Sequence, residues 1–260
     1  MMISAIIPAR YKSSRFEGKL LEKIGEKSII QHVYEAVKCA QSVNEVIVAT
    51  DDQRIYDVVK NCGGVAVMTR SEHKSGTDRI IETLSKTKSD IIVNVQGDEP
   101  FIDPYIVDAV VAPLVKTDTV NIATAAVRIS NPEDIANSNN VKVVLDSQRY
   151  ALYFSRSPIP FVRDVADKEK AHYYKHIGIY CYRRSFLEKL ATLPYSMLED
   201  VEKLEQLRFL EAGERIKVIV VDHESIGIDT PSDLEKAREH HKNLDKRSSQ
   251  TRDNRQQTTD

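Results

Sequence analysis

The first hundred residues alternate between short apolar runs and segments with helical spacing, and this alternation restricts the fold more than any other feature of the sequence. The apolar runs lie at residues 3–7, 45–49 and 90–95, each bounded by polar residues typical of turns. Between them, apolar residues recur at every third or fourth position, as on one face of an α-helix. Strands that alternate with amphipathic helices form a mostly parallel sheet covered by helices on both faces. The sequence therefore predicts an α/β fold of the doubly wound type.

The second half has a different rhythm, because strand-like segments follow Pro100 without helices between most of them. These segments cover residues 121–129, 141–145, 150–155 and 177–182. Without intervening helices, neighbouring strands pair as a mixed or antiparallel sheet. We therefore expect a smaller mixed-strand insertion at about residues 120–190.

Helical spacing returns toward the C-terminal end. Residues 198–210 and 234–241 have it, and the apolar run 216–221 lies between them. Thr230, Pro231 and Asp233 form a start signal for the last helix, with Thr as the cap and Pro at the first helical position.

One domain accounts for most of the chain. We expect a single domain over residues 1–241, with the mixed-strand insertion inside it. From residue 242 onward only Leu244 is apolar, so no buried surface offsets the entropy of ordering this segment. Residues 242–260 are therefore predicted to be a disordered tail.

Charge and cysteine content disfavour several partners and locations. Lys and Arg number 37 and Asp and Glu 39, so a net charge of −2 gives no field that recruits nucleic acid or an anionic membrane. Cys39, Cys62 and Cys181 are far apart and form no CxxC pair, which favours a reducing compartment. The apolar run before Pro8 is too short for a signal sequence or a membrane span. We expect a cytoplasmic protein that binds neither nucleic acid nor membrane.

Two cations follow the first apolar run. Arg10 comes just after it and Lys19 lies nine residues later, on a loop that Pro8 and Gly18 shape. Ligands of open α/β sheets bind at the carboxyl ends of strands, where a loop before a helix offers N–H groups and positive charge to phosphates. Solvated loop charges are the alternative explanation. The loop is not a Walker A motif and the chain has no Gly-x-Gly-x-x-Gly, which disfavours a dinucleotide-binding dehydrogenase.

Two acidic residues are candidate ligands of a magnesium ion. Asp98 follows Gly97, at the end of the third apolar run, and carboxylate oxygens are suitable ligands for Mg²⁺. Asp229 precedes the last predicted helix, and it would share the ion if both segments line one cleft. A conformational explanation stays open for both, because Gly and Asp build turns and an acid before a helix complements the helix dipole.

A polar segment between a predicted strand and a helix contains Arg70, Ser75 and Gly76. Ser75 is suited to cap the helix, and capping alone explains its presence. Gly76 would also let a flat base approach the backbone.

His176, Tyr180 and Tyr182 lie at even spacing on one predicted strand, which places them on the same side of a sheet. This polar and aromatic face suits a sugar pocket or a subunit interface. The other histidines are scattered without zinc-type spacing, so a histidine metal site is not expected.

Taken together, these segments resemble one family, 3-deoxy-manno-octulosonate (Kdo) cytidylyltransferase, also called CMP-Kdo synthetase. The resemblance covers about residues 3–240 in unchanged order, and so many motifs at compatible spacing are far more specific than any one of them. The matching segments are Ile-Pro-Ala-Arg at 7–10 with Lys19, Ser-Gly-Thr at 75–77, Asn-Val-Gln-Gly-Asp-Glu-Pro at 94–100, and residues 141–146, 150–156, 176–180, 204–208 and 229–231.

The resemblance implies a role for each site residue. Arg10, Lys19 and Asp98 would be catalytic, and Asp98 and Asp229 would hold Mg²⁺. The nucleotide would be bound by Ala9, Arg10, Ser13, Lys19, Arg70, Ser75, Gly76 and Gln96. The sugar acid would be bound by Gln96, Arg156, His176, Tyr180, Glu205 and Gln206.

The resemblance also implies the fold and the reaction. The fold would be that of a doubly wound nucleotidyltransferase whose insertion helps to form a homodimer. CMP would pass from CTP to the anomeric hydroxyl of Kdo, releasing pyrophosphate and forming CMP-Kdo for lipopolysaccharide synthesis. An 8-amino-Kdo or another nonulosonic acid is an alternative substrate. Two other classes stay open: a GT-A glycosyltransferase, although position 96 is Gln where Asp-x-Asp is typical, and an inactive nucleotide sensor.

Overall fold

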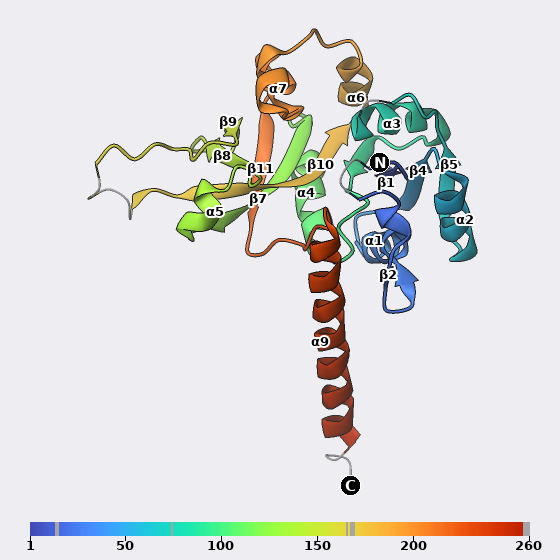
Figure 1. The fold of residues 1–260 in the computed structure, drawn as a ribbon. Helices are drawn as coiled ribbons and strands as arrows, with labels where there is room; N and C mark the ends of the chain where they lie inside the picture. Colours follow the sequence, from blue (N-terminus) through green and yellow to red (C-terminus); the bar gives the residue numbers. More distant parts are fainter. Residues whose placement is uncertain (14–15, 74, 165, 167–169, 257–260) are drawn as a thin grey trace.

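The computed structural model describes residues 1–13, 16–73, 75–164, 166 and 170–256. Within these residues, a nine-stranded sheet forms the centre of the molecule (Figure 1). Seven of its strands lie side by side in the order β11-β7-β10-β6-β1-β4-β5, and β8 and β9 are attached beside β10. The seven strands are β1 (Ile3–Ala9), β4 (Glu45–Thr50), β5 (Val65–Met68), β6 (Ile91–Asn94), β7 (Ile122–Ile129), β10 (Tyr173–Arg183) and β11 (Ile216–Val221).

The sheet is mostly parallel, as predicted. Strand β1 pairs in parallel with β4 and β6, β4 with β5, and β11 with β7, whereas β10 runs antiparallel to both of its neighbours. The chain moves outward from β1 to β4 and β5, and then returns to place β6 on the other side of β1. This reversal creates a switch point between β1 and β6, which is where open α/β sheets bind ligands.

Helices cover both faces of the sheet, and each face has its own core. Alternate residues of β1 divide between the two cores, with Ala5 and Ile7 in one and Ile6 in the other. The first core is completed by apolar residues of α1 (Ile29–Lys38), α2 (Gln53–Asn61), α4 (Pro104–Lys116) and α9 (Pro231–Gln256). The second is completed by α3 (Gly76–Thr83), η2 (Leu84–Lys86), α6 (Arg184–Leu190) and α8 (Gln206–Glu211). Two layers of helices around one sheet confirm the doubly wound class.

The region predicted as an insertion contributes to the central sheet. Strands β7 and β10 are full members of it, because their alternating apolar residues pack into both cores. Only α5 (Pro132–Ala136), β8 (Lys142–Leu145) and β9 (Ala151–Ser155) form an arm beside the sheet (Figure 1). The four strand-like segments of the second half are thus confirmed, but two of them belong to the main body.

Other elements are short or were not predicted. The helical spacing over 198–210 corresponds to two helices, α7 (Met197–Glu202) and α8, because Lys203 adopts a left-handed conformation with a φ of 54° and ends α7. The pattern does not predict α4, whereas β5 is the strand expected before the polar segment that contains Arg70. The remaining elements are η1 (Lys19–Leu21) and the small hairpin of β2 (Lys23–Ile24) and β3 (Lys27–Ser28).

The start signal of the last helix is confirmed. The backbone N–H of Thr230 donates to Asp233 Oδ2 at 3.0 Å, and that of Asp233 donates to Thr230 Oγ1 at 3.3 Å. Helix α9 then continues to Gln256 and extends away from the body (Figure 1), and disorder of the segment from residue 242 stays a prediction. No Gly or Pro interrupts this polar segment, so its backbone continues the helix. Residues 257–260 lie outside the described part.

No helix of the described residues combines the length and the apolar character that a membrane crossing needs.

Candidate active site

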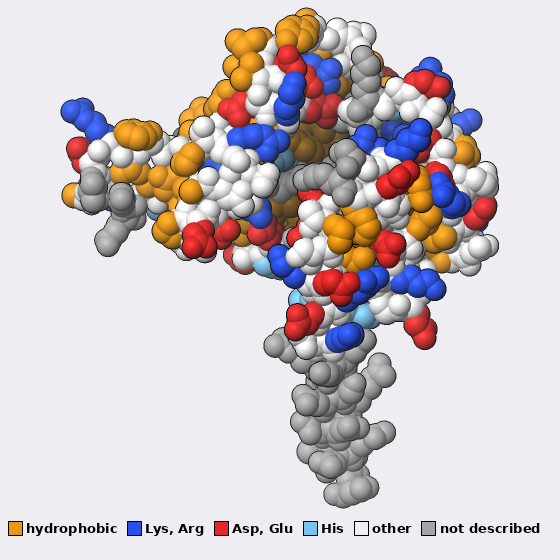
Figure 2. Space-filling model, in the orientation of Figure 1, with side chains coloured by type: hydrophobic (Ala, Val, Ile, Leu, Met, Phe, Trp, Pro, Cys, Tyr) orange, Lys and Arg blue, Asp and Glu red, His pale blue; other side chains and the backbone are white. Residues whose placement is uncertain are grey.

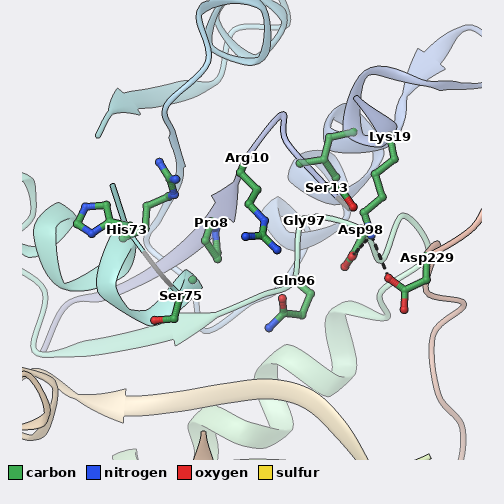
Figure 3. Close-up of a pocket in the computed structure, with 13 residues that line it drawn as sticks. Pro8, Arg10, Ser13, Lys19, His73, Ser75, Gln96, Gly97, Asp98 and Asp229 are labelled. Carbon is green, nitrogen blue, oxygen red and sulfur yellow. Dashed lines mark hydrogen bonds and ion pairs between the residues drawn. The ribbon is translucent and has the colours of Figure 1, made fainter. Parts of the chain in front are cut away.

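A cavity of about 250 Å³ opens at the carboxyl ends of β1 and β6, at the switch point of the sheet (Figure 3). It is formed by the loop after β1, the start of α3, the segment after β6 and Asp229 in the segment before α9. Eight residues selected from the sequence line it: Arg10, Ser13, Lys19, Ser75, Gly76, Gln96, Asp98 and Asp229. The structure therefore brings together side chains that are as much as 219 positions apart in the chain.

The loop after β1 is closed by contacts that direct Lys19 toward the cavity. Gly18, with a φ of +70°, donates its N–H to the carbonyl oxygen of Tyr11 at 2.9 Å. A Cβ at position 18 would lie 2.9 Å from the ring of Tyr11, so a side chain is excluded there. The guanidinium of Arg54 lies 3.4 Å from the centroid of the same ring, and Asp52 holds that guanidinium through two hydrogen bonds of 2.7 and 3.0 Å. Helix α2 thus supports the loop from outside.

Lys19 lies at the centre of a group of oxygen atoms. Its Nζ donates to Asp98 Oδ2 at 2.6 Å and to Asp229 Oδ1 at 3.1 Å (Figure 3). It also donates to the carbonyl oxygen of Ile228 at 2.8 Å. The N–H of Ile228 donates to the carbonyl oxygen of Asp98 at 2.9 Å, which ties the two acidic segments together. The prediction that Asp98 and Asp229 line one cleft is confirmed. We call Arg10, Lys19, Asp98 and Asp229 the charged rim.

The segment after β6 approaches β1 closely. A Cβ on Gly97 would lie 3.1 Å from the carbonyl oxygen of Pro8, so only glycine fits without displacement of the backbone. Gln96 lines the cavity and donates from Nε2 to the carbonyl oxygen of Gly178 on β10 at 3.2 Å. Gln96 therefore connects the cavity to the antiparallel strand of the sheet.

Ser75 both caps α3 and lines the cavity. Its Oγ accepts from the N–H of Asp78 at 3.1 Å, and its own N–H donates to Asp78 Oδ2 at 3.1 Å. The capping explanation is correct, and the helix that Ser75 caps begins at the cavity wall with Gly76. The positive end of its dipole therefore faces this space.

Two predicted nucleotide-binding residues do not line the cavity. Arg70 has a side chain that is 73% exposed and pairs with Glu82 at 3.5 Å. Ala9 is buried at the end of β1. His73 lines the cavity instead, with its Nε2 on the same Glu82 carboxylate, and sequence reasoning missed it. Its position two residues before Ser75 was the available signal.

A second group of polar side chains lies beside the cavity, on β10. His176, Tyr180 and Tyr182 share one face, as predicted, with ring centroids 5.3 and 5.6 Å apart in sequence order. They do so although a bulge interrupts β10 between Ile177 and Tyr180. We call these three residues the aromatic row. Tyr182 is fully buried inside the chain, which argues against the alternative that this face is a subunit interface.

Burial sets the ionisation of this second group. It lowers the pKa of His176 to about 3, and raises the pKa of Tyr180 and that of the Glu205 carboxyl. The Oγ1 of Thr124 donates to the carbonyl oxygen of Ile179 at 2.7 Å, so it is available to accept from Nε2 of a neutral His176 at 2.9 Å. The hydroxyls of Tyr180 and Tyr182 are buried without a hydrogen-bond partner among the described residues.

The other predicted sugar-binding residues lie around the start of α8. Glu205 accepts hydrogen bonds from Thr77 Oγ1 at 2.5 Å and from Arg208 Nη2 at 3.1 Å, and Gln206 is buried beside it. Arg156 donates from Nε to the carbonyl oxygen of Glu202 at 2.8 Å. None of these residues lines the cavity. Glu205 is connected to it through Thr77, which follows the lining residue Gly76.

The charged rim fits a divalent cation. Asp98 and Asp229 offer carboxylate oxygens and Ile228 a carbonyl oxygen, which are the hard donors that Mg²⁺ and similar ions prefer. No group of three or more His, Cys, Asp or Glu side chains suited to a metal occurs among the described residues. An ion here would therefore take its remaining ligands from a bound molecule or water.

Comparison with known proteins assigns the chain to a class. The sequence model of the family described as cytidylyltransferase matches residues 4–216. A 4-diphosphocytidyl-2C-methyl-D-erythritol synthase from Anaerococcus prevotii has a TM-score of 0.63 at 16% identity, covering 92% of this chain and 97% of its own, and this likeness concerns the fold alone. The fold, the cavity and the family match define a nucleotidyltransferase enzyme.

More similar proteins define the family within that class. The 3-deoxy-manno-octulosonate cytidylyltransferase of Geobacter sulfurreducens is 51% identical over 247 residues, which is 92% of this chain and 99% of the relative. The corresponding protein of Solibacter usitatus is 49% identical over 234 residues, covering 90% and 92%. A structure of CMP:2-keto-3-deoxy-manno-octonic acid synthetase in complex with CTP has a TM-score of 0.90 at 45% identity, covering 94% of this chain and 100% of its own. The chain belongs to the 3-deoxy-manno-octulosonate cytidylyltransferase family.

Proposed function

We propose that this enzyme transfers CMP from CTP to the anomeric hydroxyl of Kdo, forming CMP-Kdo and releasing pyrophosphate. The observation that carries the proposal is the meeting of Lys19, Asp98 and Asp229 at one point beside Arg10, at the switch point of the sheet. The family to which the chain belongs supports the same reaction.

The charged rim would reduce the electrostatic repulsion between the two substrates. A sugar carboxylate and a triphosphate repel each other, and one pair of unit charges 4 Å apart costs about 4 kcal/mol at an effective dielectric constant of 20. Arg10 and Lys19 lie where they would neutralise the phosphates and stabilise the charge that develops on the leaving pyrophosphate. Ser13, Ser75 and Gly76 would position the nucleotide with them, and Ala9 and Arg70 would act from the edge of this group.

Mg²⁺ is the divalent ion that we propose for Asp98 and Asp229. When bound, such an ion orients phosphate oxygens and withdraws charge from them. The two carboxylates would hold it from one side of the cavity, facing Arg10 on the loop after β1 (Figure 3). No side chain is assigned here as a general base.

The sugar acid would lie on the side of the cavity that Gln96 connects to β10. We assign its recognition to Gln96, Arg156, His176, Tyr180, Glu205 and Gln206. Because burial keeps the pKa of His176 at about 3, its ring is neutral at physiological pH and acts through hydrogen bonds. The unpartnered hydroxyl of Tyr180 is suited to bind a sugar hydroxyl.

Pyrophosphate release from CTP tests the proposal. The enzyme with CTP and Mg²⁺ would be given Kdo, 8-amino-Kdo or a different nonulosonic acid in parallel reactions. Release that is fastest with Kdo is expected, and faster release with another acid would change the substrate while keeping the reaction. Glycosyl transfer from a nucleotide sugar without pyrophosphate would support the GT-A class. Tight CTP binding with an affinity that does not depend on Mg²⁺, and without formation of product, would support an inactive nucleotide sensor.

We further propose that two copies of the chain associate through the arm. An apolar groove of about 490 Å³ lies on it, and apolar side chains gather there at the left of Figure 2. Its lining includes Ile129, Pro132, Ile135, Pro160 and Phe161, and Phe161 is 86% exposed. The homodimer that the family resemblance implies would cover this groove. Sedimentation should give a dimer for the native chain and a monomer for Phe161→Asp, whereas Tyr105→Asp, at an exposed site outside the groove, should stay dimeric.

We place the enzyme in the cytoplasm. Cys39, Cys62 and Cys181 are free thiols, and thiols persist in reducing compartments. Cell fractionation followed by immunodetection would test this location, and recovery in the periplasmic fraction would contradict it.

A further inference from the structure

The three oxygens around Lys19 are the same atoms that fit a divalent cation. We infer that Lys19 and this cation compete for Asp98, Asp229 and the carbonyl of Ile228, so that the ammonium occupies the metal position until cation and nucleotide arrive together. This inference rests on the proposed function, because it concerns the ion and the nucleotide that the function requires. It assigns Lys19 a second task besides its role at the phosphates.

The distances leave no room for an ion between these three oxygens while Nζ is bound to them. Nζ lies 2.6 to 3.1 Å from the three oxygens, and its side chain is only 11% exposed, so the ammonium fills the space between them. A divalent ion binds such oxygens at about 2.0–2.6 Å and would occupy that same space. Two cations this close would also repel each other strongly in a partly buried site. An ion can therefore take this position only if Nζ leaves it.

The protein alone is a weak ligand for the ion. Two carboxylates and one carbonyl are fewer donors than the six that Mg²⁺ takes, and no third acidic side chain joins them in the described part of the chain. With only these donors, the ion must also displace an ammonium that already satisfies them. We expect weak metal binding to the free enzyme for both reasons.

A triphosphate changes this balance on both sides. Its oxygens would add ligands to the ion, and they would also offer the displaced ammonium a new partner in the cavity that Arg10 and Ser13 line. Displacement of Lys19 and capture of the phosphates are then one event. The consequence is ordered loading, in which the ion binds tightly only with CTP.

The positions of the three oxygens, on Asp98, Ile228 and Asp229, do not depend on Lys19. The N–H of Ile228 donates to the carbonyl oxygen of Asp98 at 2.9 Å, and Asp233 accepts the N–H groups of Asp229 and Thr230 at 3.3 and 3.0 Å. These contacts, none of which involves Lys19, hold both acidic segments in place. A neutral side chain of similar length at position 19 should therefore leave these three oxygens in place.

Binding of Mn²⁺ to the enzyme without nucleotide tests the inference. Free Mn²⁺ would be measured by electron paramagnetic resonance in titrations of the native chain and of Lys19→Met. Removal of the competing cation should lower the Kd for Mn²⁺ by at least about tenfold. An unchanged or higher Kd would overturn the inference.

Two control variants locate the effect. Lys27→Met makes the same charge change in a lysine that pairs with Glu35 at 2.5 Å, remote from the cavity. This variant should keep the native Kd for Mn²⁺. A tenfold decrease of the Kd in Lys27→Met would contradict the inference, because the effect would then come from the net charge of the protein and not from Lys19. Asp98→Asn added to Lys19→Met should abolish the gain, and a gain that persists would place the ion elsewhere and overturn the inference.

A second measurement uses the native chain and does not depend on a variant that folds. Acylation of Lys19 by an amine reagent would be followed by mass spectrometry with and without saturating Mn²⁺, in the absence of CTP. Displacement of Nζ should increase the rate at Lys19 and leave the rate at Lys27 unchanged, whereas an unchanged or lower rate at Lys19 would reject displacement. Pyrophosphate release is measured separately. If the enzyme releases pyrophosphate but Mn²⁺ does not change the acylation rate at Lys19, the proposed function stands and this inference is wrong.

Discussion

The charged rim and the aromatic row place functional groups in opposite environments. At the rim, Lys19 is satisfied by ionic partners, and its acidic neighbours Asp98 and Asp229 are 29% and 49% exposed. In the row, the hydroxyls of Tyr180 and Tyr182 lie in the core without partners among the described residues. The rim holds charge that can be exchanged for the charge of a ligand, whereas the row holds neutral groups whose hydrogen bonds are unused.

This difference predicts how each region responds to substitution. Loss of a charge at the rim leaves its partners uncompensated and removes stabilisation of a charged transition state. Loss of a hydroxyl in the row removes a group that the folded protein does not satisfy, so stability should change little while ligand binding weakens. Rim variants should lower kcat, and loss of the Tyr180 hydroxyl in the row should raise KM for the sugar acid.

The largest effect is expected at the rim. Lys19→Ala should lower kcat by about a hundredfold or more, because a preorganised cation is lost at the leaving phosphates. Initial rates of pyrophosphate release and the thermal midpoint would be measured together. Lys27→Ala is the control and should keep the native rate. If Lys19→Ala is folded and turns over at the native rate, the charged rim does not take part in catalysis as proposed.

A matched pair of tyrosines tests the row. Tyr180→Phe should raise KM for the sugar acid by about tenfold, the value of one hydrogen bond, with KM for CTP unchanged. Tyr182→Phe removes another buried hydroxyl without a partner among the described residues, two positions further along the strand, and both constants should stay native. Equal effects of the two substitutions would mean that the row acts only through packing.

A smaller effect is expected where α2 supports the loop of the rim. Arg54→Ala removes the guanidinium over Tyr11 and should raise KM for CTP by about threefold, as expected for an exposed cation–π contact. Arg54→Lys should recover part of the loss. Steady-state kinetics with CTP varied would measure both, and a change in KM for the sugar acid alone would contradict the role of this support.

The smallest effect near neutral pH concerns His176. Its pKa is 6.5 in an ordinary environment and about 3 in the fold, so between these values the unfolded chain binds a proton that the folded chain does not. Stability should therefore fall as the pH decreases through this window, by up to about 1.4 kcal/mol per pH unit from this group. Urea unfolding at several pH values should show a shallower decrease for His176→Gln than for the native chain. Parallel curves would contradict the shift.

The parts of the fold and site that could be predicted are those fixed by local pattern. Arg10, Lys19 and Asp98 follow strand ends, and parallel strands bring their carboxyl ends to one edge, so their meeting follows from topology. The capped start of α9 follows from Thr230 and Asp233 for the same local reason.

The remaining features depend on tertiary contacts that a sequence pattern does not contain. Arg70 is diverted by Glu82, and His73 reaches the cavity instead. Helix α4 is apolar around much of its surface with Pro113 inside it, so it has no clear helical period. The left-handed Lys203 that separates α7 from α8 has no signal of the kind that glycine gives.

The measurement that tests the central claim most directly is CTP affinity with and without Mg²⁺ in Asp98→Asn, Asp229→Asn and the double variant. Isothermal titration of each folded protein would give the gain in affinity that the ion confers. If the two carboxylates hold one ion, each single variant should lose most of the gain and the double variant should lose no more than either. Additive losses, or a gain that survives in one single variant, would mean that Asp98 and Asp229 do not share an ion, and the proposed site would be wrong.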